Sequence, residues 1–403
     1  MIIGRPEILR KDGEAECRAA VEWSKGAGVL WYRVPAEHGD WLSELSDAAL
    51  VALLIPAMDA GEDIRLDGAV SARLLYALNG CYQAVLRGLM PFLRPVAIRA
   101  EATHSDSPRA PGVATAFSGG IDSFCVLADH HYARPPEGFR ITHLLFSRTG
   151  AFGEAGDRVM WERCERLRGH AERMGLPLVR VNSNVAEFYR PGLGNLLTHT
   201  QRNVSVGHAL QGGIGRFLYA AGFSYADLRL DPTYTMAHAD AVTLPLLSTD
   251  RLDTISAGGE YTRVEKTLKV AGIPDTWTSL NVCAGLASAG NCSTCWKCLR
   301  TLLTLDIGGV LDRYAAVFDL AAYRRRRNSF IGKVWSSRES LHREIVGLAR
   351  QRNWRRPLSS RFYRWLWLPL NRLNELALRR GPDLPAWLKA ARRLDKALSR
   401  PSS

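Results

Sequence analysis

The residues Ser118-Gly119-Gly120-Ile121-Asp122-Ser123 follow a short apolar run and precede a stretch of helical character, and their types suit phosphate chemistry. Glycine lets the backbone approach a ligand closely and adopt positive φ without strain. The helix that follows would present unpaired N–H groups and the positive end of its dipole to a phosphate. Ser118 and Ser123 add hydroxyl donors, and Asp122 can hold Mg²⁺ or cap the helix.

Two other interpretations of this loop stay open. It can be a glycine turn that Asp122 caps without any ligand. It can also be a hydrolase nucleophile elbow, because Ala116-Phe-Ser-Gly-Gly120 approximates Gly-x-Ser-x-Gly, although the first glycine is missing. The sequence contains no Gly-x4-Gly-Lys-Ser/Thr, which argues against transfer of a γ-phosphate from a Walker-type loop.

A second group with chemical potential consists of four cysteines in the pattern Cys-x8-Cys-x2-Cys-x2-Cys: Cys283, Cys292, Cys295 and Cys298. Two thiolates spaced Cys-x2-Cys can bind one ion, and four thiolates close a tetrahedral site, which predicts structural rather than catalytic Zn²⁺. An iron–sulfur cluster and unliganded buried thiols are the alternatives. We expect a cytoplasmic protein, where clustered cysteines favour a metal over disulfides.

Arg263 and Lys266 form a third candidate group between the loop and the cysteines. They are three residues apart and would share one face of a helix. Beside a reacting phosphate they would stabilise the negative charge that develops there and act as catalytic groups with Asp122. The alternative is a solvated helix face beside Glu265.

These groups must be positioned by an alternation of strands and helices that begins near residue 112. Residues 113–117, 141–146 and 178–182 predict strands, and 157–174 predicts a helix. We expect 202–221 to be helical and 225–230 to form a fourth strand. This alternation predicts an α/β fold with a parallel sheet covered on both faces.

The segment before residue 112 is expected to form a small α+β domain. Residues 15–23 and 28–34 predict a hairpin, and 43–60 and 70–89 predict helices. The polar segment 102–111 contains two prolines and predicts a boundary. We therefore divide the chain into residues 1–101, an α/β domain with the four-cysteine site over 112–322, and a basic helical segment over 323–403.

The loop from Ser118 to Ser123 resembles the Ser-Gly-Gly-x-Asp-Ser loop of the ATP pyrophosphatases, the PP-loop superfamily with a Rossmann-like parallel sheet of the HUP (adenine nucleotide alpha hydrolase) type. With the cysteine pattern about 160 residues later, the chain is similar to the 7-cyano-7-deazaguanine synthase family over residues 112–310. The resemblance implies a structural zinc knuckle. It also implies that Ser118, Gly119, Gly120 and Ser123 bind pyrophosphate, with Asp122 beside Mg²⁺. Phe146, at the end of the second strand, would face the adenine of ATP.

The function that this resemblance implies is that of an AMP-forming ligase. ATP would adenylate a carboxylate or carbonyl oxygen of a small-molecule or macromolecular substrate, and ammonia or another nitrogen nucleophile would displace AMP. One alternative is a PP-loop ligase or sulfurtransferase that modifies RNA and holds it with the basic segment. Another is a non-catalytic nucleotide-binding component of a regulatory or defence assembly. A homodimer is compatible with each of these.

Charge is distributed unevenly along the 403 residues. The formal net charge is +13, yet residues 323–403 carry 21 basic and 5 acidic side chains, so the preceding 322 residues have a net charge of −3. The basic segment interleaves arginines with tryptophans, which suits nucleic acid, an anionic membrane surface, or a helical lid with its aromatics packed inward. We expect its prolines, Pro369 among them, to divide it into short helices. The longest apolar run, 48–58, is well short of the ~20 residues that a bilayer span needs.

Overall fold

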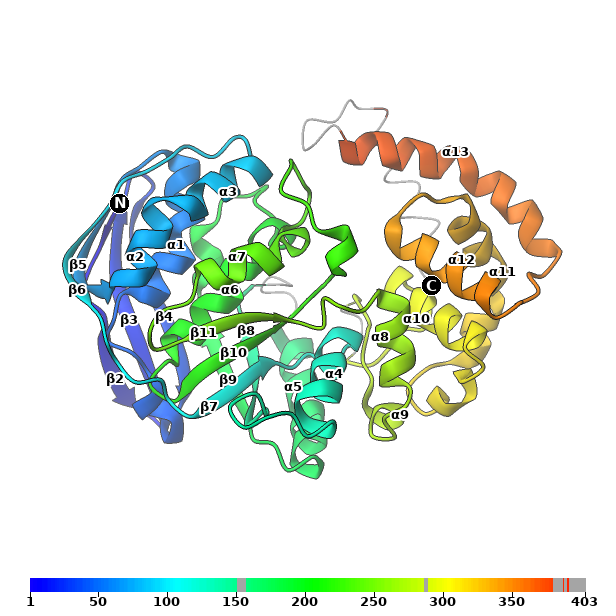
Figure 1. Cartoon of the computed structure of the whole chain (residues 1–403), viewed down its shortest axis with the longest axis horizontal. Coiled ribbons are helices and arrows are strands. Elements are labelled where there is room, and N and C mark those ends of the chain that lie inside the picture. The colour runs from blue at the N-terminus through cyan, green and yellow to red at the C-terminus, as the bar shows by residue number, and fades with distance from the viewer. Residues whose placement is uncertain (151–156, 286–288, 380–386, 388–389, 391–403) are drawn as a thin grey trace. The chain divides into compact units, whose positions relative to one another are not determined.

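The computed structural model describes residues 1–150, 157–285, 289–379, 387 and 390. The chain divides into two compact units. The first, which we call the sheet unit, comprises Met1–Phe117, Asp129–Asp157 and Cys164–Gly259. The second, the helical unit, comprises Ser118–Ala128, Arg158–Arg163 and Glu260–Ser403. Each unit is therefore built from segments that are distant in the sequence (Figure 1).

The sheet unit is organised around an eleven-stranded sheet within the described residues, in the order β11-β10-β7-β8-β9-β4-β3-β1-β5-β6, with β2 paired to β3. The strands are β1 (Ile2–Ile3), β2 (Glu7–Lys11), β3 (Glu14–Trp23), β4 (Gly26–Pro35), β5 (Ile64–Ser71), β6 (Ile98–His104), β7 (Gly112–Ala116), β8 (His143–Arg148), β9 (Leu178–Ser183), β10 (Ile214–Ala220) and β11 (Asp253–Ala257). From β11 to β9 all neighbours are parallel. The prediction of an α/β fold with a mostly parallel sheet is confirmed.

The N-terminal strands continue this sheet. The predicted hairpin is confirmed as β3 and β4, whose antiparallel register runs from Glu14↔Pro35 to Trp23↔Gly26. β4 also pairs antiparallel with β9 through Tyr32↔Ser183, which joins the hairpin to the parallel strands. The domain boundary at residues 102–111 stays a prediction.

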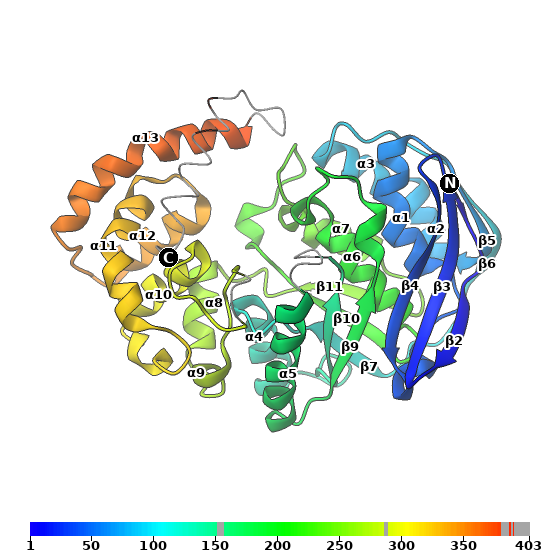
Figure 2. The ribbon, with the colours of Figure 1, turned by 180° about the vertical axis from the view of Figure 1, so that it is seen from behind.

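Helices cover the sheet and share its apolar core with the strands. They are α1 (Asp47–Ala60), α2 (Ala72–Asn79), α3 (Cys81–Leu89), α5 (Asp157–Arg173), α6 (Asn195–Ala209) and α7 (Asp240–Leu246). Residues 47–58 of α1 are all buried, and α1 packs against α6. A helix that is apolar all round belongs in the interior of a protein, and α1 lies there beside α6 (Figure 2).

Two expectations about residues 202–230 are wrong. The helix α6 ends at Ala209, and after Gly212 and Gly213 the chain forms the strand β10. Residues 225–227 form a 3₁₀ turn instead of the fourth strand. β10 lies between β7 and β11, and successive residues on both of its faces are buried. Its apolar run therefore lacks the alternation that separates a strand from a helix.

The helical unit contains α4 (Ile121–Leu127), α8 (Arg263–Val270), α9 (Thr276–Ser279), α10 (Trp296–Ile307), α11 (Leu320–Ser336), α12 (Ser340–Gln351) and α13 (Ser359–Arg379). The expectation that Pro369 breaks the chain is wrong, because it lies inside α13. Pro369 is exposed, so water can satisfy the carbonyl that its missing N–H leaves open. Among the described residues, none of the helices combines the length and apolarity of a bilayer span.

Candidate functional site

The loop between β7 and α4 adopts a conformation that depends on its glycines. Gly119 has φ +71°, in the left-handed region that favours glycine. Gly120 is extended and forms the N-cap of α4, where its carbonyl accepts from Phe124 N–H and from the Ser123 hydroxyl, each at 3.0 Å. Ser118 is exposed, whereas Gly119 is buried. The backbone thus turns sharply and leads directly into the helix that carries Asp122.

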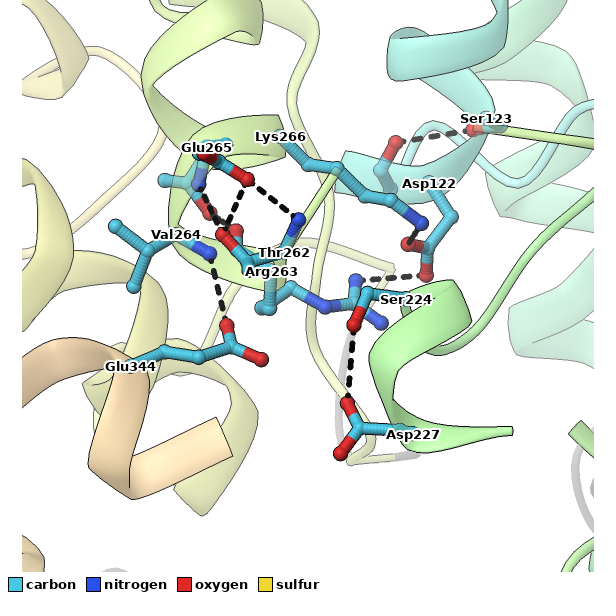
Figure 3. A network of polar contacts seen from close by, with 12 residues as sticks. Asp122, Ser123, Ser224, Asp227, Thr262, Arg263, Val264, Glu265, Lys266 and Glu344 are labelled. Carbon is cyan, nitrogen blue, oxygen red and sulfur yellow. Dashed lines mark hydrogen bonds and ion pairs between the residues drawn. The ribbon is translucent and has the colours of Figure 1, made fainter. Parts of the chain in front are cut away.

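Asp122, in the first turn of α4, receives two cationic side chains from α8. Arg263 donates through Nη1 to Oδ2 at 2.7 Å, and Lys266 donates through Nζ to Oδ1 at 3.5 Å (Figure 3). The Lys266 side chain is only 1% exposed, against 29% for Asp122. Burial alone would raise the pKa of the Asp122 carboxyl, but Arg263 and Lys266 outweigh it and hold this pKa below its usual value. The site therefore joins a carboxylate to two basic side chains, of which that of Lys266 is almost fully buried.

The start of α8 is fixed independently of Asp122. Thr262 and Glu265 form a capping box in which each side chain accepts from the other residue's backbone N–H (Figure 3). Glu344 of α12 accepts from the Val264 N–H at 3.2 Å. These contacts order the first turn of α8, from which Arg263 and Lys266 extend one turn apart.

A third cation near Asp122 comes from α10. Arg300 is buried and lies over the ring of Trp296, 5.0 Å from its centroid. Burial and the positive charge of Arg263 lower the pKa of the Arg300 guanidinium to about 10, so it stays protonated at neutral pH. Within the described part of the chain Arg300 forms no salt bridge. Reasoning from the sequence does not link Arg300 to Asp122, because the two residues are far apart in the chain and only the fold brings their charges together.

The four cysteines converge as their spacing predicts. All four Sγ atoms lie within 4.8 Å of one another, and the pairs Cys283–Cys295 and Cys292–Cys298 are each 4.0 Å apart. Tetrahedral zinc with Zn–S bonds of about 2.3 Å places its sulfurs about 3.8 Å apart, close to this arrangement. Thiolates on the separate irons of a four-iron cluster would be more widely spaced. The cluster thus fits a single zinc-sized ion.

Backbone amides reinforce this site. Gly285 N–H donates to Cys283 Sγ at 3.3 Å, and Cys295 N–H donates to Cys292 Sγ at 3.2 Å. Such bonds stabilise thiolates and orient them toward a metal. Four thiolates, of which those of Cys283 and Cys298 are buried, leave no open coordination position, so an ion here would have a structural role.

The segment that carries the cysteines also supports the glycine loop. The Asn281 N–H donates to the Gly119 carbonyl at 2.7 Å. Asn281 Nδ2 donates to Ala289 O at 2.6 Å, and its Oδ1 accepts from Cys283 N–H at 3.3 Å. The sequence interpretation missed this asparagine, whose only signal is its place two residues before the first cysteine. Its contacts couple the order of the cysteine segment to the conformation of Gly119.

The structure brings most of the sequence-predicted site residues into one unit. The loop residues, both cationic residues of α8 and the four cysteines belong to the helical unit. Phe146 is the exception: it lies on β8 in the sheet unit, buried and in register with Arg180 of β9. Its assignment to the adenine stays a prediction.

Neither a protein-family model, nor a curated protein, nor a solved structure shows significant similarity to this chain.

Proposed function

We propose that the chain is an ATP-dependent, AMP-forming ligase of the PP-loop type, with a Rossmann-like sheet of the HUP class. The observation that carries the proposal is the convergence of Arg263 and buried Lys266 on Asp122, directly after a loop whose Gly119 has positive φ. Two cations beside a glycine loop match the charge and the close backbone approach that a polyphosphate requires.

In the proposed reaction a substrate oxygen attacks the α-phosphorus of ATP. The bond from the α-phosphorus to the bridging oxygen breaks, and pyrophosphate leaves with a gain of negative charge. Lys266 and Arg263 would stabilise this charge at a site where Lys266 is shielded from water. Asp122 would orient both cations before ATP binds, because each of its oxygens accepts from one of them.

The acyl adenylate formed in this step would then react with ammonia or another nitrogen nucleophile. Attack of the nitrogen on the activated carbon forms a carbon–nitrogen bond, as in an amide, and expels AMP. The products of the two steps are therefore the amidated substrate, AMP and pyrophosphate. Both oxygens of Asp122 already face cations, so Mg²⁺ would arrive with the ATP phosphates, which supply oxygen ligands of their own. Zinc in the four-cysteine cluster would support the loop and take no part in the chemistry.

The test measures AMP and pyrophosphate formed from ATP by the full chain, with ammonia and a panel of small carboxylates, RNA and protein substrates. We expect release of pyrophosphate with at least one class. Lys266→Met should lower kcat by roughly 10²–10³, as loss of one donor to a developing anion does. Lys269→Met is the matched control, since Lys269 lies on the same helix and contacts Tyr261 instead of Asp122.

Three results would redirect the assignment. Turnover with RNA alone would identify an RNA-modifying enzyme, including a sulfurtransferase if sulfide replaces ammonia as the nucleophile. Tight ATP binding without any pyrophosphate across the panel would identify a nucleotide-binding component of an assembly. Release of ADP and phosphate would contradict the AMP-forming chemistry altogether.

A further inference from the structure

The helix α13 has two faces of different character, and the inner one packs on α11. Trp367 Nε1 donates to Ser329 Oγ at 3.2 Å, and Asn371 Nδ2 donates to Lys333 O at 3.0 Å and to Ser336 Oγ at 2.8 Å. Gly332 of α11 makes the approach close, because a Cβ there would lie 2.6 Å from the carbonyl carbon of Tyr363. These contacts fix the rotation of α13 about its own axis, and therefore determine which residues face outward.

The outward face carries large apolar side chains. Leu358, Phe362, Trp365 and Leu366 are 75%, 69%, 85% and 53% exposed. Leu358 directly precedes the helix, and Phe362, Trp365, Leu366 and exposed Pro369 recur within it at i, i+3, i+4 and i+7, which places these four on one side of α13. We call this set the α13 strip. An exposed apolar patch of this kind is a mark of an interaction surface. Of the three alternatives for the basic segment, the helical lid with its aromatics packed inward describes Trp367 but not Phe362 and Trp365.

Exposed arginines accompany the α13 strip. Arg361 and Arg372 lie along one border of it, and Arg364 is also exposed. The whole segment 323–403 has a net charge of +16. From this combination we propose that α13 docks the protein on an anionic membrane surface, with the α13 strip in the interfacial layer and the arginines at the lipid headgroups.

Charge and side-chain type favour this partner over two others. A second copy of the chain would bring one strongly cationic segment against another, with few carboxylates to offset the repulsion. Single-stranded nucleic acid stacks its bases on flat aromatic rings, whereas Leu358 and Leu366 supply aliphatic area that bases do not use. A bilayer interface accepts Trp, Phe and Leu together and attracts arginine when its lipids are anionic. The docking is independent of any turnover of ATP.

The test is cosedimentation of the full chain with phosphatidylcholine vesicles, with and without phosphatidylglycerol. We expect binding only to vesicles that contain the anionic lipid, and weaker binding as salt is raised. Phe362→Ser/Trp365→Ser/Leu366→Ser should weaken binding by roughly a hundredfold, because three apolar side chains lose their burial. Arg361→Gln and Arg372→Gln should each weaken it about fivefold.

Tyr76→Ser is the matched control, because Tyr76 of α2 is equally exposed but belongs to the sheet unit. It should leave vesicle binding unchanged. The altered side chains are exposed, so we expect thermal transitions like that of the unaltered protein, which separates loss of docking from loss of folding. Equal binding to neutral and anionic vesicles would overturn the proposal. So would capture of single-stranded RNA without vesicle binding, or a dimer that the triple substitution dissociates.

Discussion

The carboxyl of Asp240 gives the sheet unit a pH-dependent stability that can be measured. Asp240 is the first residue of α7 and is 2% exposed. The Thr200 hydroxyl donates to Oδ1 at 2.7 Å, while Oδ2 has no hydrogen-bond partner among the described residues. Burial raises the pKa of this carboxyl to about 7, and the bond from Thr200 opposes the shift only in part.

The size and sign of the effect follow from the two pKa values. An unfolded Asp has a pKa of about 3.9, about 3 units below that of Asp240 in the folded protein. This difference in pKa corresponds to about 4 kcal/mol in the free energy of unfolding. The folded state binds the Asp240 proton more tightly than the unfolded state does, so protonation of this carboxyl stabilises the fold. The free energy of unfolding should therefore decrease as pH rises from about 4 to about 7, and this contribution should stay constant above that range.

Replacing Asp240 with Asn removes the titration and keeps an acceptor for Thr200. The free energy of unfolding of Asp240→Asn minus that of the unaltered protein should therefore increase by roughly 3 kcal/mol as the pH is raised from 5 to 8.5. Urea denaturation followed by circular dichroism measures this difference. Glu137→Gln, at an exposed site, is the control and should show no such gain. Parallel pH profiles for Asp240→Asn and the unaltered protein would refute the assignment of a buried neutral carboxyl.

Two further predictions concern the loop and the metal. Gly119→Ala should lower the free energy of unfolding by about 1–2 kcal/mol, because an Ala at this positive φ is strained, and should weaken ATP binding in calorimetry. Gly175→Ala is the control: Gly175 has φ +69° and open space around it, so this variant should lose a similar amount of stability and bind ATP normally. If both variants bind ATP alike, Gly119 is not a ligand-contacting residue. Elemental analysis should find one zinc per chain, and Cys298→Ser should lose it. Without zinc the cysteine segment should hold Asn281 less firmly, so the Asn281 bond to Gly119 weakens and hydrogen exchange over residues 118–128 should increase. Unchanged exchange in that segment after zinc loss would show that the two sites are uncoupled.

The sequence by itself determined those features that depend on neighbouring residues. Cys-x2-Cys spacing brings thiolates together through a tight turn, so the cluster at Cys283–Cys298 could be foreseen and its atoms do converge. The alternation of apolar runs and helical segments indicated β7, β8 and β9 for the same reason. Charge counts alone separated a near-neutral body from a strongly basic segment.

The tertiary structure decided what depends on residues far apart. Arg263 and Asp122 are 141 positions apart, and only the packing of α8 against α4 brings them together as a partly buried ion pair. The apolar run of β10 was ambiguous in the sequence, and only the structure shows it as a strand between β7 and β11 with consecutive residues buried. The basic segment likewise contains both buried and exposed tryptophans: Trp367 faces α11, whereas Trp365 faces solvent. The sequence cannot distinguish them, because the rotation of α13 is fixed by its hydrogen bonds to Ser329, Lys333 and Ser336 of α11.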